Sequence, residues 1–110
     1  MALPSGWRIM WTIVLFDLPT KTKNERRAYT TFRKYLLEQG FSFIQYSVYA
    51  RCDVGEERAG SLATKIKTHL PANGEVRMLQ ITDRQFGRME SFSHGKRVST
   101  EKKWEQLEFF

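Results

Sequence analysis

The sequence predicts a single α+β domain in which strands alternate with amphipathic helices. Three observations predict it: a long uncharged run near the N-terminus, two segments with apolar residues at helical spacing, and segments rich in aromatic and β-branched residues between and after them. The chain has 110 residues, of which 41% are hydrophobic and 14% aromatic. A chain of this length and composition can bury one hydrophobic core.

The first predicted element is a strand over residues 9–16, which carries no charge and ends at Asp17. Such a run is typical of a strand buried on both faces at the centre of a sheet. Pro19 has no N–H to donate to a neighbouring strand, so strand pairing should end before it. We therefore expect the Asp17 carboxylate at the rim of the sheet. The alternative is that Asp17 only begins the turn formed by residues 17–20.

A helix is expected next, because Thr22 and Glu25 have the spacing of a capping box and Gly40 supplies a C-terminal stop. Its apolar face consists of Ala28, Tyr29, Phe32, Tyr35 and Leu36. Basic residues precede the helix and occupy its other side: Lys21, Lys23, Arg26, Arg27, Arg33 and Lys34. They form either a solvated helix face or a surface that follows nucleic-acid phosphates, and the scarcity of acidic residues among them favours the phosphate surface.

Residues 41–52 are too many for one strand and predict two, about Ser42 to Gln45 and Ser47 to Cys52, with a tight reversal between them. A second helix is expected from about Glu56 to Leu70, followed by a strand over residues 76–82. The order β-α-β-β-α-β is the ferredoxin-like pattern, with four antiparallel strands and both helices on one face.

The C-terminal part is less regular. Phe86, Met89 and Phe92 are compatible with a short fifth strand or a turn of helix, and residues 91–103 are polar enough to predict a mobile linker. The chain then ends in an apolar tail containing Trp104, Leu107, Phe109 and Phe110. We divide the chain into a ferredoxin-like domain at 1–92, including the fifth strand, and a basic linker with an apolar tail at 93–110. The tail either packs on its own dimer or docks on a partner protein.

The charge and cysteine content restrict the partners and the compartment. A net charge of +6 favours an anionic partner, nucleic acid first and a membrane surface second. No apolar run has the length needed to span a bilayer, and residues 1–8 lack the basic region of a signal peptide. Cys52 is the single cysteine, which excludes an intrachain disulfide and favours the cytoplasm. The separation of His69 and His94 argues against a zinc site.

The open face of the sheet predicts an oligomer. It is expected to carry some of the aromatic residues Trp7, Trp11, Phe43, Tyr46 and Tyr49. Monomers rarely expose so large an apolar patch, so we infer a two-fold homodimer with its sheets face to face. Two copies of Asp17 across the dyad could hold Mg²⁺ together with water, and metal-bound water gives a route to phosphodiester hydrolysis.

Three segments carry a family resemblance: residues 14–19 (Val-Leu-Phe-Asp-Leu-Pro), residues 32–41, and residues 45–49 (Gln-Tyr-Ser-Val-Tyr). In sequence and spacing they resemble the CRISPR-associated protein two family, the small dimeric partner of the CRISPR integrase. The similarity extends to about Phe92. Residues 16–20 and 85–89 resemble the branch found with Cas9-type (type II) systems, whereas the tail matches little.

The resemblance implies a ferredoxin-like homodimer in which a C-terminal strand crosses to the partner's sheet. It also implies that Asp17 is the Mg²⁺ ligand and catalytic group, with Mn²⁺ as the substitute metal. Family members have been assigned endonuclease activity on single-stranded RNA or double-stranded DNA. In spacer acquisition they bridge two integrase dimers and support the incoming DNA. Many relatives have Tyr before the Asp, where this chain has Phe16, which removes a hydroxyl from the site.

Two hypotheses therefore follow: a metal-dependent nuclease that uses the Asp17 pair, and a non-catalytic DNA-binding scaffold within the integrase complex. One carboxylate per chain, with no His, Lys or Glu base expected beside it, favours the scaffold. A non-catalytic ferredoxin-like RNA-binding protein is the alternative. It is disfavoured because the sequence lacks the signature of a basic residue, Gly, an aromatic residue and Gly that such proteins use for base stacking.

Overall fold

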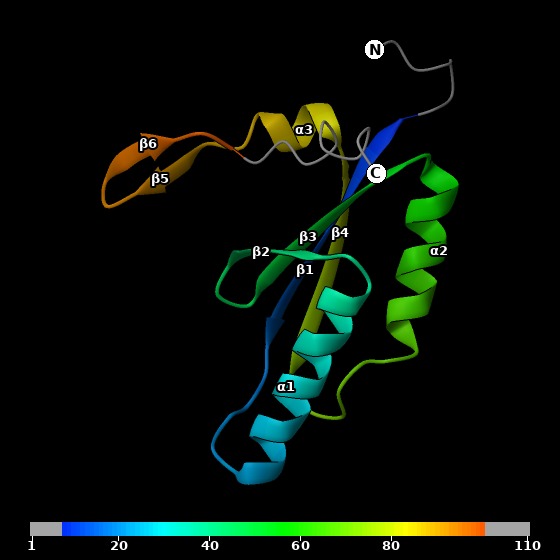
Figure 1. Cartoon of the computed structure of the whole chain (residues 1–110), viewed down its shortest axis with the longest axis vertical. Coiled ribbons are helices and arrows are strands. Elements are labelled where there is room, and N and C mark those ends of the chain that lie inside the picture. Colours follow the sequence, from blue (N-terminus) through cyan, green and yellow to red (C-terminus); the bar gives the residue numbers. More distant parts are fainter. Residues whose placement is uncertain (1–7, 101–110) are drawn as a thin grey trace.

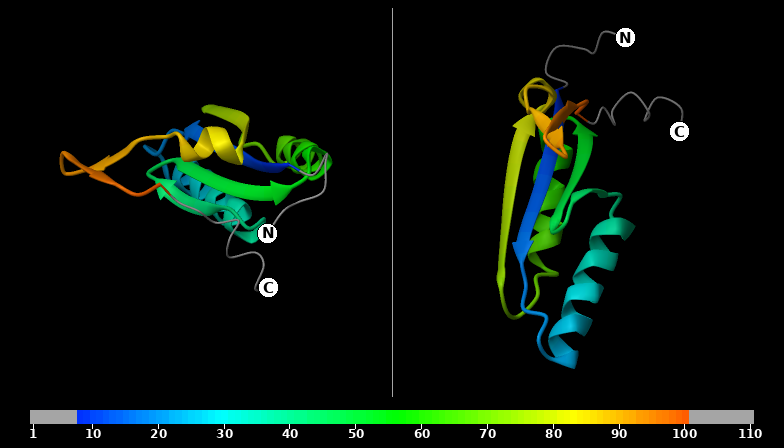
Figure 2. Two further views of the ribbon diagram at one scale, coloured as in Figure 1. Left: turned by 90° about the horizontal axis from the view of Figure 1, so that it is seen from above. Right: turned by 90° about the vertical axis from the view of Figure 1, so that its left-hand side faces the viewer.

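The computed structural model describes residues 8–100 (Figure 1). The elements in chain order are β1 (Ile9–Asp17), α1 (Lys23–Glu38), β2 (Ser42–Gln45), β3 (Val48–Val54), α2 (Glu56–Lys67), β4 (Glu75–Thr82), α3 (Asp83–Gly87), β5 (Ser91–Ser93) and β6 (Lys96–Val98). Strands β1 to β4 form one sheet in the order β2-β3-β1-β4, with every pair antiparallel. Helices α1 and α2 lie on the same face of this sheet (Figure 2). The predicted ferredoxin-like arrangement is confirmed.

Local signals set the ends of the first two elements. β1 lies inside the sheet and ends at Asp17, two residues before Pro19, as the uncharged run predicts. The capping box of α1 is formed, because the Thr22 hydroxyl accepts from the Glu25 N–H and the Glu25 carboxylate accepts from the Thr22 N–H. At the other end Gly40 has φ +85°, a conformation that glycine adopts without steric cost.

The main core lies between the sheet and the two helices. Phe32 and Leu36 of α1 and Ile66 of α2 pack there against buried residues of the sheet, which include Val14, Phe16 and Tyr49. Tyr49, one of the aromatic residues considered for the open face, lies on the helix-covered face instead. Its place on the strand directs it to the helix side, where its ring stacks with that of Phe16 at 5.8 Å between centroids.

A second, smaller core lies on the opposite face of the sheet. The Trp11 ring stacks on Phe86 of α3 with 3.8 Å between ring centroids, and the Trp11 indole N–H donates to the Asp83 carboxylate at 2.7 Å. Both aromatic side chains are buried. Trp11 is therefore on the expected face, but the chain's own α3 covers it. The part of this face toward Asp17 stays uncovered, and Leu79 in it is 52% exposed.

The segment expected as a polar linker contains regular structure. Residues 91–98 form an antiparallel hairpin in which β5 pairs with β6 through a turn at His94 and Gly95, both with positive φ. The hairpin extends away from the sheet (Figure 1). The linker interpretation is therefore wrong for these residues. Trp7 and the tail residues Trp104, Leu107, Phe109 and Phe110 lie outside the described residues.

Candidate metal and nucleic-acid site

Asp17 is exposed at the end of β1, on backbone that two neighbouring segments hold in place. The Phe16 N–H donates to the carbonyl of Ser47, in the turn between β2 and β3, at 3.0 Å. On the other side Gly74 packs so tightly that a Cβ added to it would lie 2.6 Å from the Asp17 carbonyl oxygen. Gly74 also has φ +88°, so both its conformation and the space around it favour glycine. The carboxylate therefore projects from a fixed position at the rim of the sheet.

Glu75 is the functional candidate that the sequence reasoning missed. The first residue of β4 lies directly opposite the last residue of β1, which pairs Glu75 with Asp17 across the two strands. Directly opposed residues of antiparallel strands point to the same face. The expectation that no glutamate lies beside Asp17 is therefore wrong. The Asn73-Gly74 turn marks the start of β4 in the sequence, but the pairing of Glu75 with Asp17 depends on the register between two distant strands.

Both carboxylate residues line an open hollow of about 250 Å³. Its walls are formed by residues from the ends of β1, β4 and the β2–β3 turn: Leu15, Phe16, Asp17, Tyr46, Ser47, Val48, Glu75 and Arg77. Arg77 partly offsets the negative charge, because its guanidinium lies 3.8 Å from a Glu75 carboxylate oxygen. We call this cavity the Asp17 hollow.

The donor chemistry of the Asp17 hollow suits a hard cation. Magnesium favours oxygen ligands, keeps several waters and is often held by one or two carboxylates. Asp17 and Glu75 supply two carboxylates in one chain. Within residues 8–100 no three acidic, cysteine or histidine side chains gather closely enough to form a complete protein cage. The residues therefore fit a hydrated Mg²⁺ and do not fit a metal enclosed by protein ligands.

Tyr46 lines the Asp17 hollow together with Phe16. Its ring stacks near that of Tyr29 of α1, with 6.2 Å between centroids and 21° between planes. The hydrogen bond with Tyr29 is the largest cause of a raised pKa for Tyr46, and the Asp17 carboxylate adds a smaller effect in the same direction. The Tyr46 phenol therefore stays protonated near neutral pH, as a hydrogen-bond donor within the electric field of Asp17.

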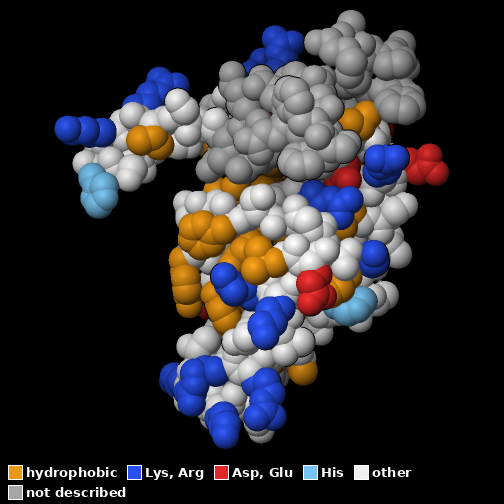
Figure 3. All heavy atoms as spheres, in the orientation of Figure 1, with side chains coloured by type: hydrophobic (Ala, Val, Ile, Leu, Met, Phe, Trp, Pro, Cys, Tyr) orange, Lys and Arg blue, Asp and Glu red, His pale blue; other side chains and the backbone are white. Residues whose placement is uncertain are grey.

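The predicted basic residues lie in the loop before α1, in its first turn and farther along its exposed side. Figure 3 shows Lys and Arg side chains gathered over the end of the molecule where α1 begins. All of them are exposed: Lys21, Lys23, Arg26, Arg27, Arg33 and Lys34. No carboxylate of residues 8–100 forms an ion pair with any of them. The surface therefore keeps its positive charge within the described part of the chain.

Two of these basic residues also have structural contacts. Arg26 donates to the carbonyls of Thr20 and Lys21, at 3.3 and 2.8 Å, and so fixes the loop that follows Asp17. Arg33 donates to the Tyr49 hydroxyl at 2.9 Å. Their replacement would disturb the fold as well as the charge. Arg27 and Lys34 are therefore better positions at which to test the charge alone.

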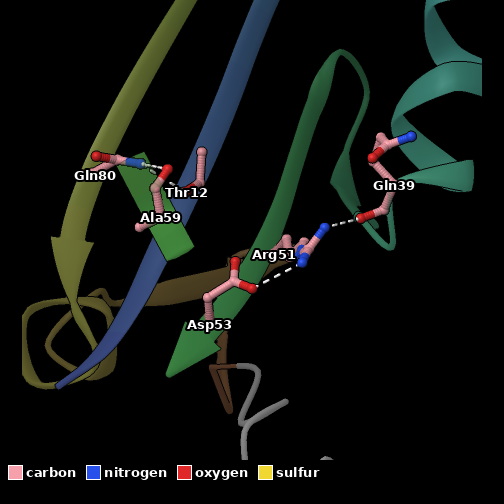
Figure 4. A network of polar contacts seen from close by, with 6 residues as sticks. All are labelled: Thr12, Gln39, Arg51, Asp53, Ala59 and Gln80. Atoms are coloured by element: carbon pink, nitrogen blue, oxygen red, sulfur yellow. Dashed lines mark hydrogen bonds and ion pairs between the residues drawn. The ribbon is translucent and has the colours of Figure 1, made fainter. Parts of the chain in front are cut away.

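A polar network at a distance from the Asp17 hollow ties the layers together (Figure 4). Arg51 donates to the Gln39 carbonyl at 2.5 Å and to the Asp53 carboxylate at 2.9 Å. The Gln80 amide donates to the Thr12 hydroxyl and to the Ala59 carbonyl, at 3.2 and 2.6 Å. These contacts connect both helices to the sheet. The network stabilises the packing of the helices on the sheet, although the second Asp53 carboxylate oxygen, Oδ2, is buried without a hydrogen-bond partner among the described residues.

No helix within residues 8–100 combines the length and apolar character needed to cross a bilayer.

Comparison with known proteins identifies the family. The family model described as CRISPR associated protein Cas2 matches residues 10–89. Three relatives carry the name CRISPR-associated endoribonuclease Cas2. The Flavobacterium psychrophilum protein is 45% identical over 94% of this chain and 90% of its own length. The Parvibaculum lavamentivorans protein is 48% identical over 92% and 100%, and the Paracidovorax avenae protein 41% identical over 96% and 98%. The matched region contains Asp17, Glu75, Tyr46 and α1, and the chain belongs to the CRISPR-associated protein Cas2 family.

Proposed function

We propose that this protein acts in CRISPR adaptation as a homodimeric, DNA-binding scaffold of the spacer-integration complex, with Mg²⁺ held at Asp17. The main support for the proposal is the relative position of two surfaces. The basic surface of α1 and the Asp17 hollow lie at the same end of the domain, so one bound nucleic acid could contact both. Family membership supplies the biological setting.

The uncovered end of the open face supports the homodimer. Leu15 of β1 and Leu79 of β4 are exposed there, on the face opposite α1 and α2. A face-to-face partner would remove this apolar surface from water, which stabilises association. The β5–β6 hairpin extends from the body with Phe92 and Val98 exposed, in keeping with a C-terminal strand that contacts a second copy.

The basic surface supports binding of a duplex through its phosphates. Phosphate contacts by Lys and Arg are independent of base sequence. They weaken as the salt concentration rises, because the release of counterions from the nucleic acid on binding becomes less favourable. We expect an Arg27→Glu/Lys34→Glu variant to bind duplexes of different sequence more weakly by similar factors, and to show a smaller salt dependence than wild type. Lys65→Glu/Lys67→Glu on α2 is the matched control, because it makes the same charge change on the other helix. A loss confined to particular sequences would contradict phosphate binding.

Metal-dependent endonuclease activity is the second candidate function. The relatives are named endoribonucleases, and Glu75 supplies a second carboxylate beside Asp17. A bound Mg²⁺ would supply an activated water and offset phosphate charge. Asp17 and Glu75 would hold the ion, Arg77 would attract the phosphate, and the Tyr46 hydroxyl would donate a hydrogen bond at the edge of the hollow. Mn²⁺, which also favours oxygen ligands, is the expected substitute.

A nuclease assay separates scaffold from enzyme. Asp17→Asn, Asp17→Ala and Glu75→Gln are compared with wild type on single-stranded RNA and duplex DNA, with and without Mg²⁺. If the protein is a nuclease, both acidic residues are needed, and each variant should cleave more than about 100-fold more slowly than wild type. A loss of this size is typical when a positioned catalytic group is removed. If it is only a scaffold, wild type shows no Mg²⁺-dependent cleavage, and the variants still bind DNA. Absence of both cleavage and DNA binding in wild type would overturn the proposal.

The integrase is the proposed protein partner, and the tail its proposed contact. The apolar residues Trp104, Leu107, Phe109 and Phe110 follow the hairpin in the sequence. Truncation at Ser99 should leave the dimer and its melting temperature unchanged but abolish co-purification with the integrase. Aggregation or unfolding of the truncated protein, with partner binding intact in its folded fraction, would instead make the tail part of the fold.

A further inference from the structure

Two aromatic side chains of the β2–β3 region remain unusually exposed. Tyr46 in the turn is 73% exposed and Phe43 of β2 is 59% exposed. Aromatic rings of this size normally lose most of their surface to packing, so the exposure of both on one hairpin indicates a surface for contact with another molecule.

The Tyr46 ring is held in place although it is exposed. It packs beside Tyr29 with 6.2 Å between ring centroids, and the Ser47 carbonyl ties the same turn to β1. Because the fold already fixes one side of the ring, its exposure lies on the other side. Phe43 is fixed in a similar way, edge-on to Tyr49 at 5.8 Å between ring centroids. A ring fixed in this way can bind a flat ligand with little further loss of conformational freedom.

Positive charge lies next to the same ring. Arg26 precedes Tyr29 by three residues on α1 and Arg33 follows it by four, so both share its side of the helix. Figure 3 shows hydrophobic side chains adjoining the Lys and Arg side chains of this region. Exposed aromatic rings beside a basic groove are the two features that proteins combine to bind single-stranded nucleic acid.

We propose that Tyr46 is a stacking platform for an unpaired base, so that a single-stranded segment crosses the β2–β3 turn while its phosphates contact α1. This inference rests on the proposed nucleic-acid binding and adds a substrate feature to it. In a duplex both faces of each base are covered by neighbouring bases, so only an unpaired base can reach the ring. Because Tyr46 lines the Asp17 hollow, such a strand would have its backbone near the two carboxylates.

The other possible occupant of the Tyr46 ring is a second copy of this chain. The position of the ring favours nucleic acid, because it packs beside Tyr29 of the basic helix α1, whereas the proposed face-to-face homodimer uses the sheet face opposite α1 and α2. The experiment therefore includes the oligomeric state as one of its measurements.

The test measures binding of a fluorescently labelled single strand and of a duplex of the same sequence, in EDTA so that no cleavage occurs. Tyr46→Leu removes the aromatic ring and keeps an apolar side chain, while Tyr46→Phe keeps the ring and removes the hydroxyl. Phe92→Leu is the control, because Phe92 is 61% exposed on the distant hairpin. Stacking of one base predicts that Tyr46→Leu weakens single-strand binding by about fivefold or more. Tyr46→Phe and Phe92→Leu should stay within about twofold, and duplex binding should change little in every variant.

Two further measurements make the result decisive. A single strand carrying 2-aminopurine should lose fluorescence on binding to wild type and to Tyr46→Phe, and lose much less with Tyr46→Leu. Sedimentation velocity should find the same oligomer for wild type, Tyr46→Leu and Tyr46→Phe. The inference is overturned if Tyr46→Leu binds single strands as wild type does, if it weakens single strands and duplex equally, or if it dissociates the dimer. Wild type that binds duplex but no single strand refutes only this inference, whereas wild type that binds neither refutes the proposed function.

Discussion

The two ends of the sheet face opposite α1 and α2 differ in what covers them. At one end, Trp11 is buried under Phe86 of α3, and its indole N–H is paired with Asp83. Toward the other end, Leu15 is exposed where it lines the Asp17 hollow, and Leu79 is exposed opposite Ile13 in the middle of β1. The chain completes its own second core at the first end only. The uncovered end is where a second molecule can add contacts.

Strand β1 extends from one end of this sheet face to the other, so its sequence alone does not explain why only one end is covered. Its residues alternate between the two faces along the whole strand, and the apolar side chains on the open face continue to Leu15. The difference comes from α3, which follows β4 directly and folds back over one end of the sheet. Cover supplied by a later segment therefore decides which part of an apolar face is core and which part is a surface for partners.

Replacing Phe86 of α3, which covers Trp11, should have the largest effect on stability. Phe86→Ala removes the ring that stacks on Trp11, so we expect a loss of about 3–5 kcal/mol in the free energy of unfolding. Urea denaturation followed by tryptophan fluorescence measures it. Phe92→Ala is the control, because its exposed ring should cost no more than about 0.5 kcal/mol. Equal effects of the two changes would mean that α3 does not stabilise this end.

At the Asp17 end the backbone has little space to move. Gly74→Ala places a methyl group against the Asp17 carbonyl and Leu18, in addition to the cost of its positive φ. We expect a loss of about 3 kcal/mol together with weaker metal binding, because the strand end that carries Asp17 must shift. The matched control is Gly55→Ala, which has φ +97° but no neighbouring atom within 4 Å. It should cost only about 1–2 kcal/mol and leave metal binding unchanged, and equal losses would exclude the steric contact as the cause.

Local patterns predicted most of the fold. The uncharged run gave β1, the Thr22 capping box gave the start of α1, and the reversal at Tyr46 and Ser47 was expected even though Ser47 adopts φ +63° without being glycine. The linker interpretation failed at His94-Gly95, a dipeptide compatible with a tight hairpin turn. Thr82 and Gln85 also form a capping box, which is a local signal for α3.

The candidate site was predicted only in part. Asp17 could be selected because the end of one strand determines its position. Glu75 could not, because its place depends on the register between β1 and β4, two strands far apart in the sequence. A shift of one residue in that register would direct Glu75 to the opposite face. The cover over Trp11 likewise depends on tertiary packing between distant segments, which no local pattern specifies.

A charge at the uncovered end should weaken the proposed dimer more than the monomer. Leu79→Glu would bring a carboxylate from each subunit into an apolar contact, so we expect the dimer dissociation constant to rise about 30-fold, or about 2 kcal/mol. Sedimentation equilibrium measures this change. Leu70→Glu, at another exposed leucine beyond α2, should leave the constant unchanged. An unchanged dimer in Leu79→Glu would exclude this face as the interface.

The smallest expected effect is on the pH dependence of stability, and it arises from Cys52 at the end of the sheet covered by α3. Cys52 lies opposite Trp11 in the sheet, and burial, followed by the charges of Asp53 and Asp83, raises the pKa of its thiol from 9.0 to about 11. The folded state therefore favours the neutral thiol. In the unfolded chain the thiol begins to ionise near pH 9, so its contribution to stability is complete below pH 9 and is lost as the pH rises toward 11.

Cys52→Ala removes the ionisation of the thiol. The difference between wild type and this variant therefore reports the thiol alone and not the ionisation of Tyr and Lys side chains. We expect the difference in unfolding free energy between wild type and Cys52→Ala to fall by about 1 kcal/mol from pH 8 to pH 10. Urea denaturation at several pH values measures it, and iodoacetamide should label native Cys52 very slowly at pH 8, since only about one thiol in a thousand is ionised. Parallel stability curves together with fast labelling would mean that α3 opens readily. In that case the two ends of the open face would differ far less in solution than their packing indicates.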